Sequence, residues 1–345
     1  MIGTRYQRTR ETGVSRIAIG AAACAVMAAS ASSSFGDVKS LIAGLHTGDE
    51  MRYTFNIRCG ETSVPRGTTG VGIETVTTES VGMVVRAKAD TTALDIVEVA
   101  FESYKVSLDF GQGKTEIDLG GPAPDEKAPA LARELYDKYH PLLGTVLTLN
   151  VSPGSGEITT FHGGEDLLKS PGGSALRRYV DPDLFKGRFG EIFQLKSNSM
   201  MPPPGNPWYV QGHVMAFAHV AKCPVWETRV VENMEADVAK ITGTTHATGD
   251  QGDAAKGAVF VKSVIADTAY KWDTMRGRLV SLKRSESIST SFSRGSVPFD
   301  SDLVSTSTLE LVAPESKTKP ATPASAPPLP PPPSPADAAG GKQAP

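Results

Sequence analysis

The feature that most constrains the fold of this chain is a period-two alternation of apolar and polar residues across roughly residues 37–313. Successive side chains of a strand point to opposite faces, so this alternation predicts antiparallel strands with one face in a core and one in water. The apolar members of four such runs are Tyr53, Phe55 and Ile57; Tyr104, Val106, Leu108 and Phe110; Leu147, Leu149 and Val151; and Val280, Leu282, Ile288 and Phe292.

Helical spacing interrupts the strand pattern in the middle of the chain. Residues 124–139 place Leu131, Leu135 and Tyr139 on one helical face, and the acidic pair at 125–126 suits the first turn of a helix. Residues 174–195 also have helical spacing, in pieces separated at Pro182.

Two aspartates beside Pro182 are candidate N-caps for the second helical piece. Asp181 and Asp183 flank Pro182, and either aspartate suits the N-cap of the helix that follows. The middle of the chain is therefore expected to be helical, with one hairpin at about residues 143–163 between its two parts.

Strand blocks flank this helical middle at residues 45–161 and 208–312. Each block opens with a strand that ends at a cysteine, which suggests a pseudo-repeat of two half-sheets. We predict a single α+β domain over residues 32–313. Its large antiparallel sheet is curved, either open or nearly closed as a barrel, with the helices on its concave side.

The first 31 residues have the pattern of an export signal. Four arginines precede an uncharged run, and Ala29-Ser30-Ala31 forms a small-x-small cleavage site, so a mature chain would begin near Ser32. Two alternatives stay open: lipidation at Cys24, which follows three alanines, or retention of the segment as an anchor. Export predicts a periplasmic or extracellular location.

The C-terminal segment, residues 314–345, is rich in proline and alanine and contains no aromatic residue. Such a composition predicts a disordered tail or spacer, because it cannot bury enough apolar surface to offset its ordering entropy. Its PxxP spacing leaves open a role as a ligand for a proline-binding partner.

Charge and hydropathy exclude two classes of partner. The chain carries 35 basic and 38 acidic residues, and loss of the +3 signal segment would leave a net charge of −6. An acidic chain has no electrostatic reason to bind nucleic acid. No segment of the mature chain is long and apolar enough to predict a transmembrane helix.

Cys59 and Cys223 are the two cysteines that remain after signal cleavage. Export places them in an oxidising compartment, which favours a disulfide between the two strand blocks. Two free thiols are the alternative. Formation of the bridge requires the two Cα atoms to approach within about 7 Å.

No catalytic, metal-binding or cofactor-binding group can be assigned from the sequence. Gly111-Gln112-Gly113-Lys114-Thr115 lacks the preceding glycine of a phosphate-binding loop and is followed by a strand pattern, so it predicts a hairpin turn. None of the six histidines has a second ligand at metal-binding spacing. Three tryptophans lie late in the chain, where they either fill the core or line an apolar ligand cavity: Trp208, Trp226 and Trp272.

Three stretches carry a resemblance to a known class. The hairpin at 143–163, the segment 270–281 and the opening GDEMRYTF at 48–55, taken with the signal segment, resemble an uncharacterised class of bacterial exported β-rich proteins. The resemblance covers residues 45–312 and brings no catalytic residues with it. In layout the chain is also similar to the periplasmic lipoprotein carriers, which implies a curved sheet that cups helices and holds lipid.

These observations predict a non-catalytic protein of the cell envelope, with a binding or a structural role. A carrier or sensor of an apolar ligand such as lipid, held in the concavity of the sheet, is the first alternative. A hydrolase with a dispersed active site is the second. A cavity of several hundred Å³ in the concavity would favour the carrier, whereas a filled concavity would favour an interaction protein.

Overall fold

The computed structural model describes residues 40–68, 72–111, 113–170, 172–196, 200–215, 222–248, 260–294 and 297–313; the side chains of residues 174, 212–215, 222–224, 248 and 294 are not described. The first strand block contains β1 (Glu50–Pro65), β2 (Ile73–Asp90), β3 (Asp95–Asp109), β4 (Lys114–Asp118), β5 (Val146–Val151) and β6 (Ile158–His162). The second contains β7 (Pro207–Met215), β8 (Lys222–Glu235), β9 (Val238–Thr248), β10 (Phe260–Asp273), β11 (Arg278–Arg294) and β12 (Val297–Val312).

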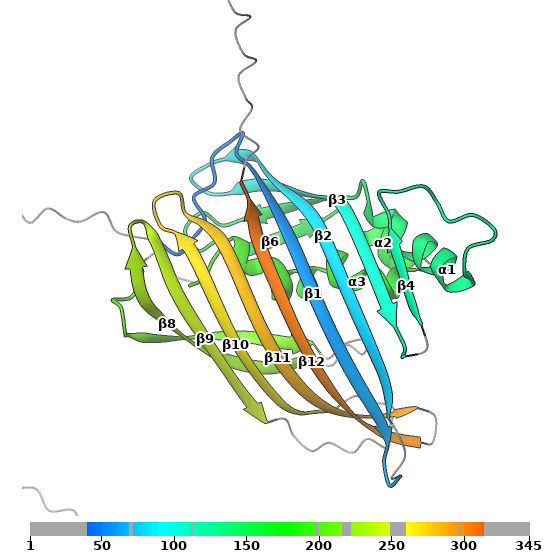
Figure 1. The fold of residues 1–345 in the computed structure, drawn as a ribbon. Coiled ribbons are helices and arrows are strands. Elements are labelled where there is room, and N and C mark those ends of the chain that lie inside the picture. Colours follow the sequence, from blue (N-terminus) through cyan, green and yellow to red (C-terminus); the bar gives the residue numbers. More distant parts are fainter. Residues whose placement is uncertain are drawn as a thin grey trace, which may run out of the picture. The chain divides into compact units, whose positions relative to one another are not determined.

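All twelve strands form one antiparallel sheet (Figure 1). Its order is β6-β5-β3-β2-β1-β12-β11-β10-β9-β8-β7, with β4 paired to β3. The two strand blocks are therefore the two halves of the sheet, and they join where β1 pairs with β12 from Arg52–Val312 to Pro65–Phe299. The sheet is curved and not closed. This confirms the predicted α+β class with a curved sheet and decides for the open form of the two alternatives.

Four helices and two 3₁₀ turns cover the inner face of the sheet. They are α1 (Ala130–Tyr139), η1 (His140–Leu142), α2 (Glu165–Lys169), α3 (Gly173–Val180), α4 (Pro182–Phe189) and η2 (Gly190–Ile192). Figure 1 shows α3 behind the broad sheet and α1 beside β4 at one side of it. No helix in the described ranges has the length and apolar character to cross a bilayer.

Aromatic side chains join the helices to the inner face. The ring of Phe189 packs edge-on against Phe55 of β1 at a centroid distance of 5.3 Å. Tyr179 of α3 packs in the same way against Phe101 of β3 at 5.9 Å. These rings belong to the main core, which also takes in the predicted apolar residues Leu147, Leu149 and Val151.

A β-bulge changes one of the predicted runs. On β11, Ser281 pairs with Lys271 and Leu279 pairs with Trp272, so Val280 is the extra residue. Leu279 is fully buried, while Val280 is only half-buried. The prediction that Val280 shares the face of Leu282 was therefore wrong, because the extra residue reverses the alternation at this point. Phe110 was also misplaced, since it follows the end of β3 and is 47% exposed.

The predicted helix over residues 124–139 begins six residues late, at Ala130. The carboxylate of Asp125 accepts hydrogen bonds from the backbone N–H groups of Lys127 and Ala128, which makes a turn where a first helical turn was expected. Pro129 then occupies the N-cap position. In the second helical stretch Asp181 is the N-cap of α4, and its side chain accepts from the backbone N–H groups of Asp183 and Leu184.

Several predictions fall outside the described residues. The signal segment with Cys24 and the proline-rich tail both lie there, as does the side chain of Cys223. Cys59 is a buried free thiol in this structure, and burial raises its pKa to about 12. The disulfide, the cleavage site, the tail and the pseudo-repeat stay predictions. The expectation that each block opens with a strand ending at a cysteine was wrong, because β1 continues past Cys59 to Pro65 and Cys223 lies at the start of β8.

Replacing Phe189 with alanine tests whether helix docking stabilises the whole sheet. Phe189 is completely buried between Phe55, Tyr179 and Phe185. We expect Phe189→Ala to lower the free energy of unfolding by about 3–5 kcal/mol, measured by urea denaturation, because it leaves a cavity in the core. Phe110→Ala is the matched control, since this exposed ring should contribute less than about 1 kcal/mol. Equal effects of the two substitutions would contradict this account of the core.

Candidate functional site

A polar band crosses the inner face of the sheet between two apolar rows. Cross-strand pairing aligns Arg229, Gly243, Thr268, Arg284 and Ser307 in one row, and Glu227, Thr245, Ala266, Glu286 and Ser305 in the next. The apolar row on one side consists of Val231, Ile241, Tyr270, Leu282 and Leu309. The row on the other side includes Val264, Ile288 and Leu303. Each strand from β8 to β12 thus contributes polar residues to a face that is otherwise apolar.

A glycine makes room for one carboxylate of the polar band. A Cβ atom at Gly243 would overlap the side chain of Glu227, because that side chain extends across β9 at this point. Only glycine allows such a close approach. The carboxylate of Glu227 is thereby placed beside the hydroxyl of Tyr270 on the next strand, which donates to its two oxygens at 2.9 and 3.1 Å.

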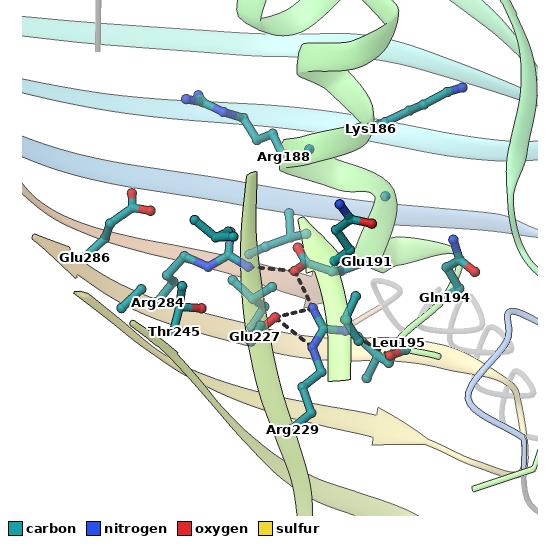
Figure 2. A pocket seen from close by; sticks show the side chains of 18 of the residues that line it. Lys186, Arg188, Glu191, Gln194, Leu195, Glu227, Arg229, Thr245, Arg284 and Glu286 are labelled. Carbon is teal, nitrogen blue, oxygen red and sulfur yellow. Dashed lines mark hydrogen bonds and ion pairs between the residues drawn. The ribbon is translucent and has the colours of Figure 1, made fainter. Parts of the chain in front are cut away.

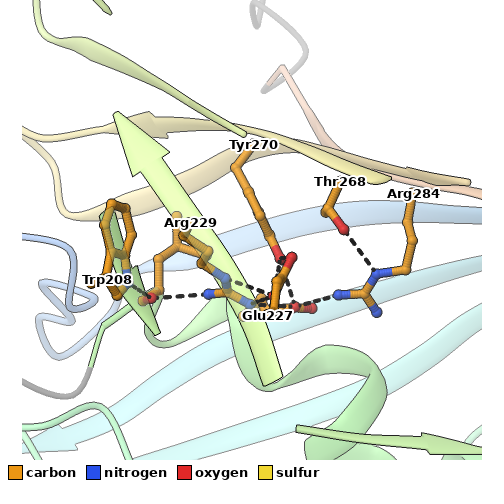
Figure 3. A network of polar contacts seen from close by, with 8 residues as sticks. Trp208, Glu227, Arg229, Thr268, Tyr270 and Arg284 are labelled. Atoms are coloured by element: carbon orange, nitrogen blue, oxygen red, sulfur yellow. Dashed lines mark hydrogen bonds and ion pairs between the residues drawn. The ribbon is translucent and has the colours of Figure 1, made fainter. Parts of the chain in front are cut away.

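Arg229 is the centre of the ionic network in this band (Figure 3). Its Nε and Nη2 groups donate to Glu227 Oε2 at 2.8 and 2.6 Å. Its Nη2 group also donates to Glu191 Oε1 at 3.0 Å, and its Nη1 group donates to the carbonyl oxygen of Leu195 at 2.9 Å. The guanidinium lies 4.6 Å from the ring centroid of Tyr270, within cation–π range.

Arg284 completes the network from β11. Its Nη2 group donates to Glu191 Oε1 at 2.6 Å, and its Nε group donates to the hydroxyl of Thr268 at 3.4 Å. Two guanidinium groups therefore balance two carboxylates, and the network as a whole is neutral. Charges removed from water need such pairing, because the desolvation cost of each ion is several kcal/mol.

The two glutamates of the polar band have opposite pKa shifts. Burial acts to raise the pKa of Glu227, but the charges of Arg229 and Arg284 outweigh it and hold the pKa below its ordinary value of 4.5. Burial raises the pKa of Glu286 above 4.5, and Arg284 and Arg188 offset this only in part. Glu286 is therefore the carboxylate of the band that most readily accepts a proton.

A cavity of about 700 Å³ lies between the polar band and α4 (Figure 2). Seven strands contribute to its lining, namely β1 and β7 to β12, which shows directly that the sheet curves around this space. The wall contributed by α4 and the residues after it includes Leu184, Arg188, Glu191 and Gln194. Apolar side chains of the strands complete it, among them Phe55, Trp208, Val225, Ala266, Leu282 and Leu309.

Three polar atoms of the cavity lining are buried without a hydrogen-bond partner among the described residues. They are the donor Arg188 Nη1 and the acceptors Glu191 Oε2 and Gln194 Oε1. Buried polar atoms are nearly always satisfied by protein, water or ligand. The residues that carry these atoms line the cavity and bring polar groups to its wall.

The structure separates the three tryptophans that the sequence marks as possible cavity residues. Trp208 lines the cavity, and its indole Nε1 donates to the carbonyl oxygen of Leu195 at 3.4 Å. Trp272 is fully buried in the main core, where its indole donates to Ser40. Trp226 is 58% exposed, because it alternates with the buried residues Val225 and Glu227 and so faces outward.

Sequence reasoning missed the charged residues of the band. The sequence did contain a signal for them. Glu227 and Arg229 are separated from Val225 and Val231 by even numbers of residues, so all four side chains lie on the same face of the strand. In the same way Arg284 and Glu286 lie between Leu282 and Ile288 in the inward positions of β11. Charged residues at inward positions of an otherwise apolar strand face mark a buried polar site.

Comparisons with known proteins identify no family for this chain. No protein-family model and no curated protein sequence matches it. A solved structure of lipovitellin is similar over 78% of this chain at 12% identity and a TM-score of 0.45, and this chain spans 26% of the length of that one. An outer membrane channel from Pseudomonas putida F1 is similar over 80% of this chain and 98% of its own, at 9% identity and a TM-score of 0.28.

The opposite pKa shifts of Glu286 and Glu227 predict opposite effects of the same substitution. A raised pKa in the folded state means that ionisation of Glu286 destabilises the fold as the pH rises above 4.5. Glu286→Gln should therefore raise the melting temperature at pH 7 and leave it unchanged below pH 4. Thermal melts across pH 3.5–8 measure this difference.

Glu227→Gln is the matched control in the same row of the sheet. Its lowered pKa means that the charged form stabilises the fold above pH 4.5, and this stabilisation is lost as the pH falls. The substitution should cost about 3 kcal/mol at pH 7, because it leaves Arg229 without its closest counter-ion. If both variants lose stability at neutral pH, the assignment of Glu286 is wrong.

Proposed function

We propose that this chain is an exported binding protein of the cell envelope that holds one amphiphilic small molecule and catalyses no reaction on it. The observation that carries this proposal is the cavity of about 700 Å³ between α4 and the polar band. Small-molecule sites in proteins have volumes of about 300–1,000 Å³ and combine apolar walls with a few placed polar groups. The space inside the curved sheet has both properties.

The lining of the cavity favours an amphiphile over a purely apolar ligand. Phe55, Trp208 and Leu282 offer apolar contact for a hydrocarbon chain. Arg188, Glu191 and Gln194 bring polar side chains to the same lining, where hydrocarbon alone would leave polar groups without partners. A molecule with an apolar body and one polar end satisfies both parts of the lining.

The envelope location is part of the proposal and has its support in the sequence. The arginines before an uncharged run and the small-x-small site at residues 29–31 have the pattern of an export signal. A signal-dependent shift in mass between precursor and exported protein would support this part of the proposal.

Native mass spectrometry of the exported protein, purified without detergent, tests the function most directly. The expected result is a population whose mass exceeds that of the chain by one bound small molecule, which organic extraction removes. Repeated purification of an unliganded chain that also takes up no added amphiphile would overturn the proposal.

Filling part of the cavity should weaken binding while the fold persists. Ala266 lines the cavity from β10, so Ala266→Leu should lower the affinity for the uncharged dye N-phenyl-1-naphthylamine by about tenfold, measured by fluorescence titration. Ala269→Leu is the matched control, because Ala269 lies on the same strand but on its exposed face. Equal affinities of the two variants would show that the dye binds elsewhere.

A further inference from the structure

Arg188 is half-buried and differs from the other arginines that face the helices and the polar band. Arg229 and Arg284 pair with Glu191 and Glu227, and Arg178 of α3 pairs with Glu79 of β2 at 2.7 Å. Arg188 forms no hydrogen bond or ion pair with any carboxylate in the described part of the chain, and its Nη1 group is buried without a partner. The charge of Arg188 therefore has no counter-ion among the described residues, and an anion from outside the protein could pair with it.

Two aromatic rings hold the Arg188 guanidinium in the cavity wall. Its central carbon lies 5.2 Å from the ring centroid of Phe55 and 5.7 Å from that of Tyr179. Both distances are within cation–π range, so the rings favour the charged group without taking up its N–H donors. Figure 2 shows the side chain of Arg188 extending from the helix away from Lys186.

The carboxylate that faces Arg188 across the cavity does not neutralise it. Glu286 acts on Arg188 through space, since the charge of Arg188 lowers the pKa of Glu286, yet no ion pair within 4.0 Å joins them. The hydroxyl of Ser305 donates to Glu286 at 3.4 Å. The other charged residues of the lining are engaged or exposed: Lys196 donates to the carbonyl oxygen of Met200, and Asp183 and Lys186 are exposed on α4.

We propose that Arg188 binds the anionic head group of a single-chain amphiphile, a carboxylate or a phosphate monoester, whose chain occupies the cavity against Phe55 and Leu282. The inference rests on the proposed function and adds the charge class of the ligand and the residue that selects it. A guanidinium presents its N–H donors in a planar fork that matches two oxygens of one anionic group. The chain of the same molecule then covers the apolar wall of the cavity.

The test compares a fluorescent acid with its uncharged ester. The full chain is titrated with cis-parinaric acid and with its methyl ester, which have the same hydrocarbon chain. The acid should bind the parent protein at least about tenfold more tightly than the ester, because a charged hydrogen-bonded pair is worth more than a neutral contact. Competition by oleate and by 1-oleoyl lysophosphatidate, with oleyl alcohol as the uncharged competitor, then distinguishes carboxylate from phosphate recognition.

Three variants assign the selectivity to Arg188. Arg188→Gln should weaken binding of the acid about tenfold and leave binding of the ester unchanged, which also shows that the cavity is intact. Arg188→Lys should restore part of the loss, because the ammonium keeps the charge but lacks the planar fork. Arg133→Gln is the control, because Arg133 is an exposed arginine of α1. This variant should bind both probes as the parent protein does.

The possible failures are distinguishable. If acid and ester bind the parent protein equally, or if Arg188→Gln weakens both alike, the selectivity assigned to Arg188 is wrong and the amphiphile-binding function stands. If neither probe binds, and neither oleate nor lysophosphatidate is retained in native mass spectrometry, the function and the inference are both overturned.

Discussion

The ion pair between Arg229 and Glu227 determines how the helical middle of the chain meets the sheet. Both residues point inward from β8, where an unpaired charge would cost several kcal/mol. Their pairing leaves further donors on Arg229, which reach Glu191 after α4 and the carbonyl oxygen of Leu195. A contact within one strand thus becomes the attachment point for the segment that forms the far wall of the cavity.

A similar device holds the preceding helix. Arg178 of α3 pairs with Glu79, which lies inward on β2 with its side chain fully buried. Tyr179 and Phe189 lie between Arg178 and Glu191 in the sequence, and their aromatic contacts with the sheet supply apolar area. Ionic pairs specify the position of each helix because they are costly when misplaced, whereas apolar burial supplies most of the stability and is less directional.

The cavity follows from this arrangement. The helices cover part of the inner face, and the segment that follows α4 is attached to the polar band through Glu191 and the backbone of Leu195. Side chains of the band are already engaged with one another, so they do not extend to fill the space beneath α4. The result is a polar floor beneath apolar walls, with Arg188 held in the lining by aromatic rings and lacking a counter-ion among the described residues.

The sequence by itself determined the fold class, the antiparallel pairing of strands such as 50–65 and the helical middle, because these depend on local periodicity. It also determined the cap at Asp181 to within one choice of two. Only the tertiary structure decided which inward positions meet. Glu227, Glu191 and Arg284 are far apart in the chain, and a bulge at Val280 shifts one strand by a residue. Trp208, Trp226 and Trp272 lie in three different environments for the same reason. Which residues line a cavity depends on which faces approach one another in space, and the sequence does not give this.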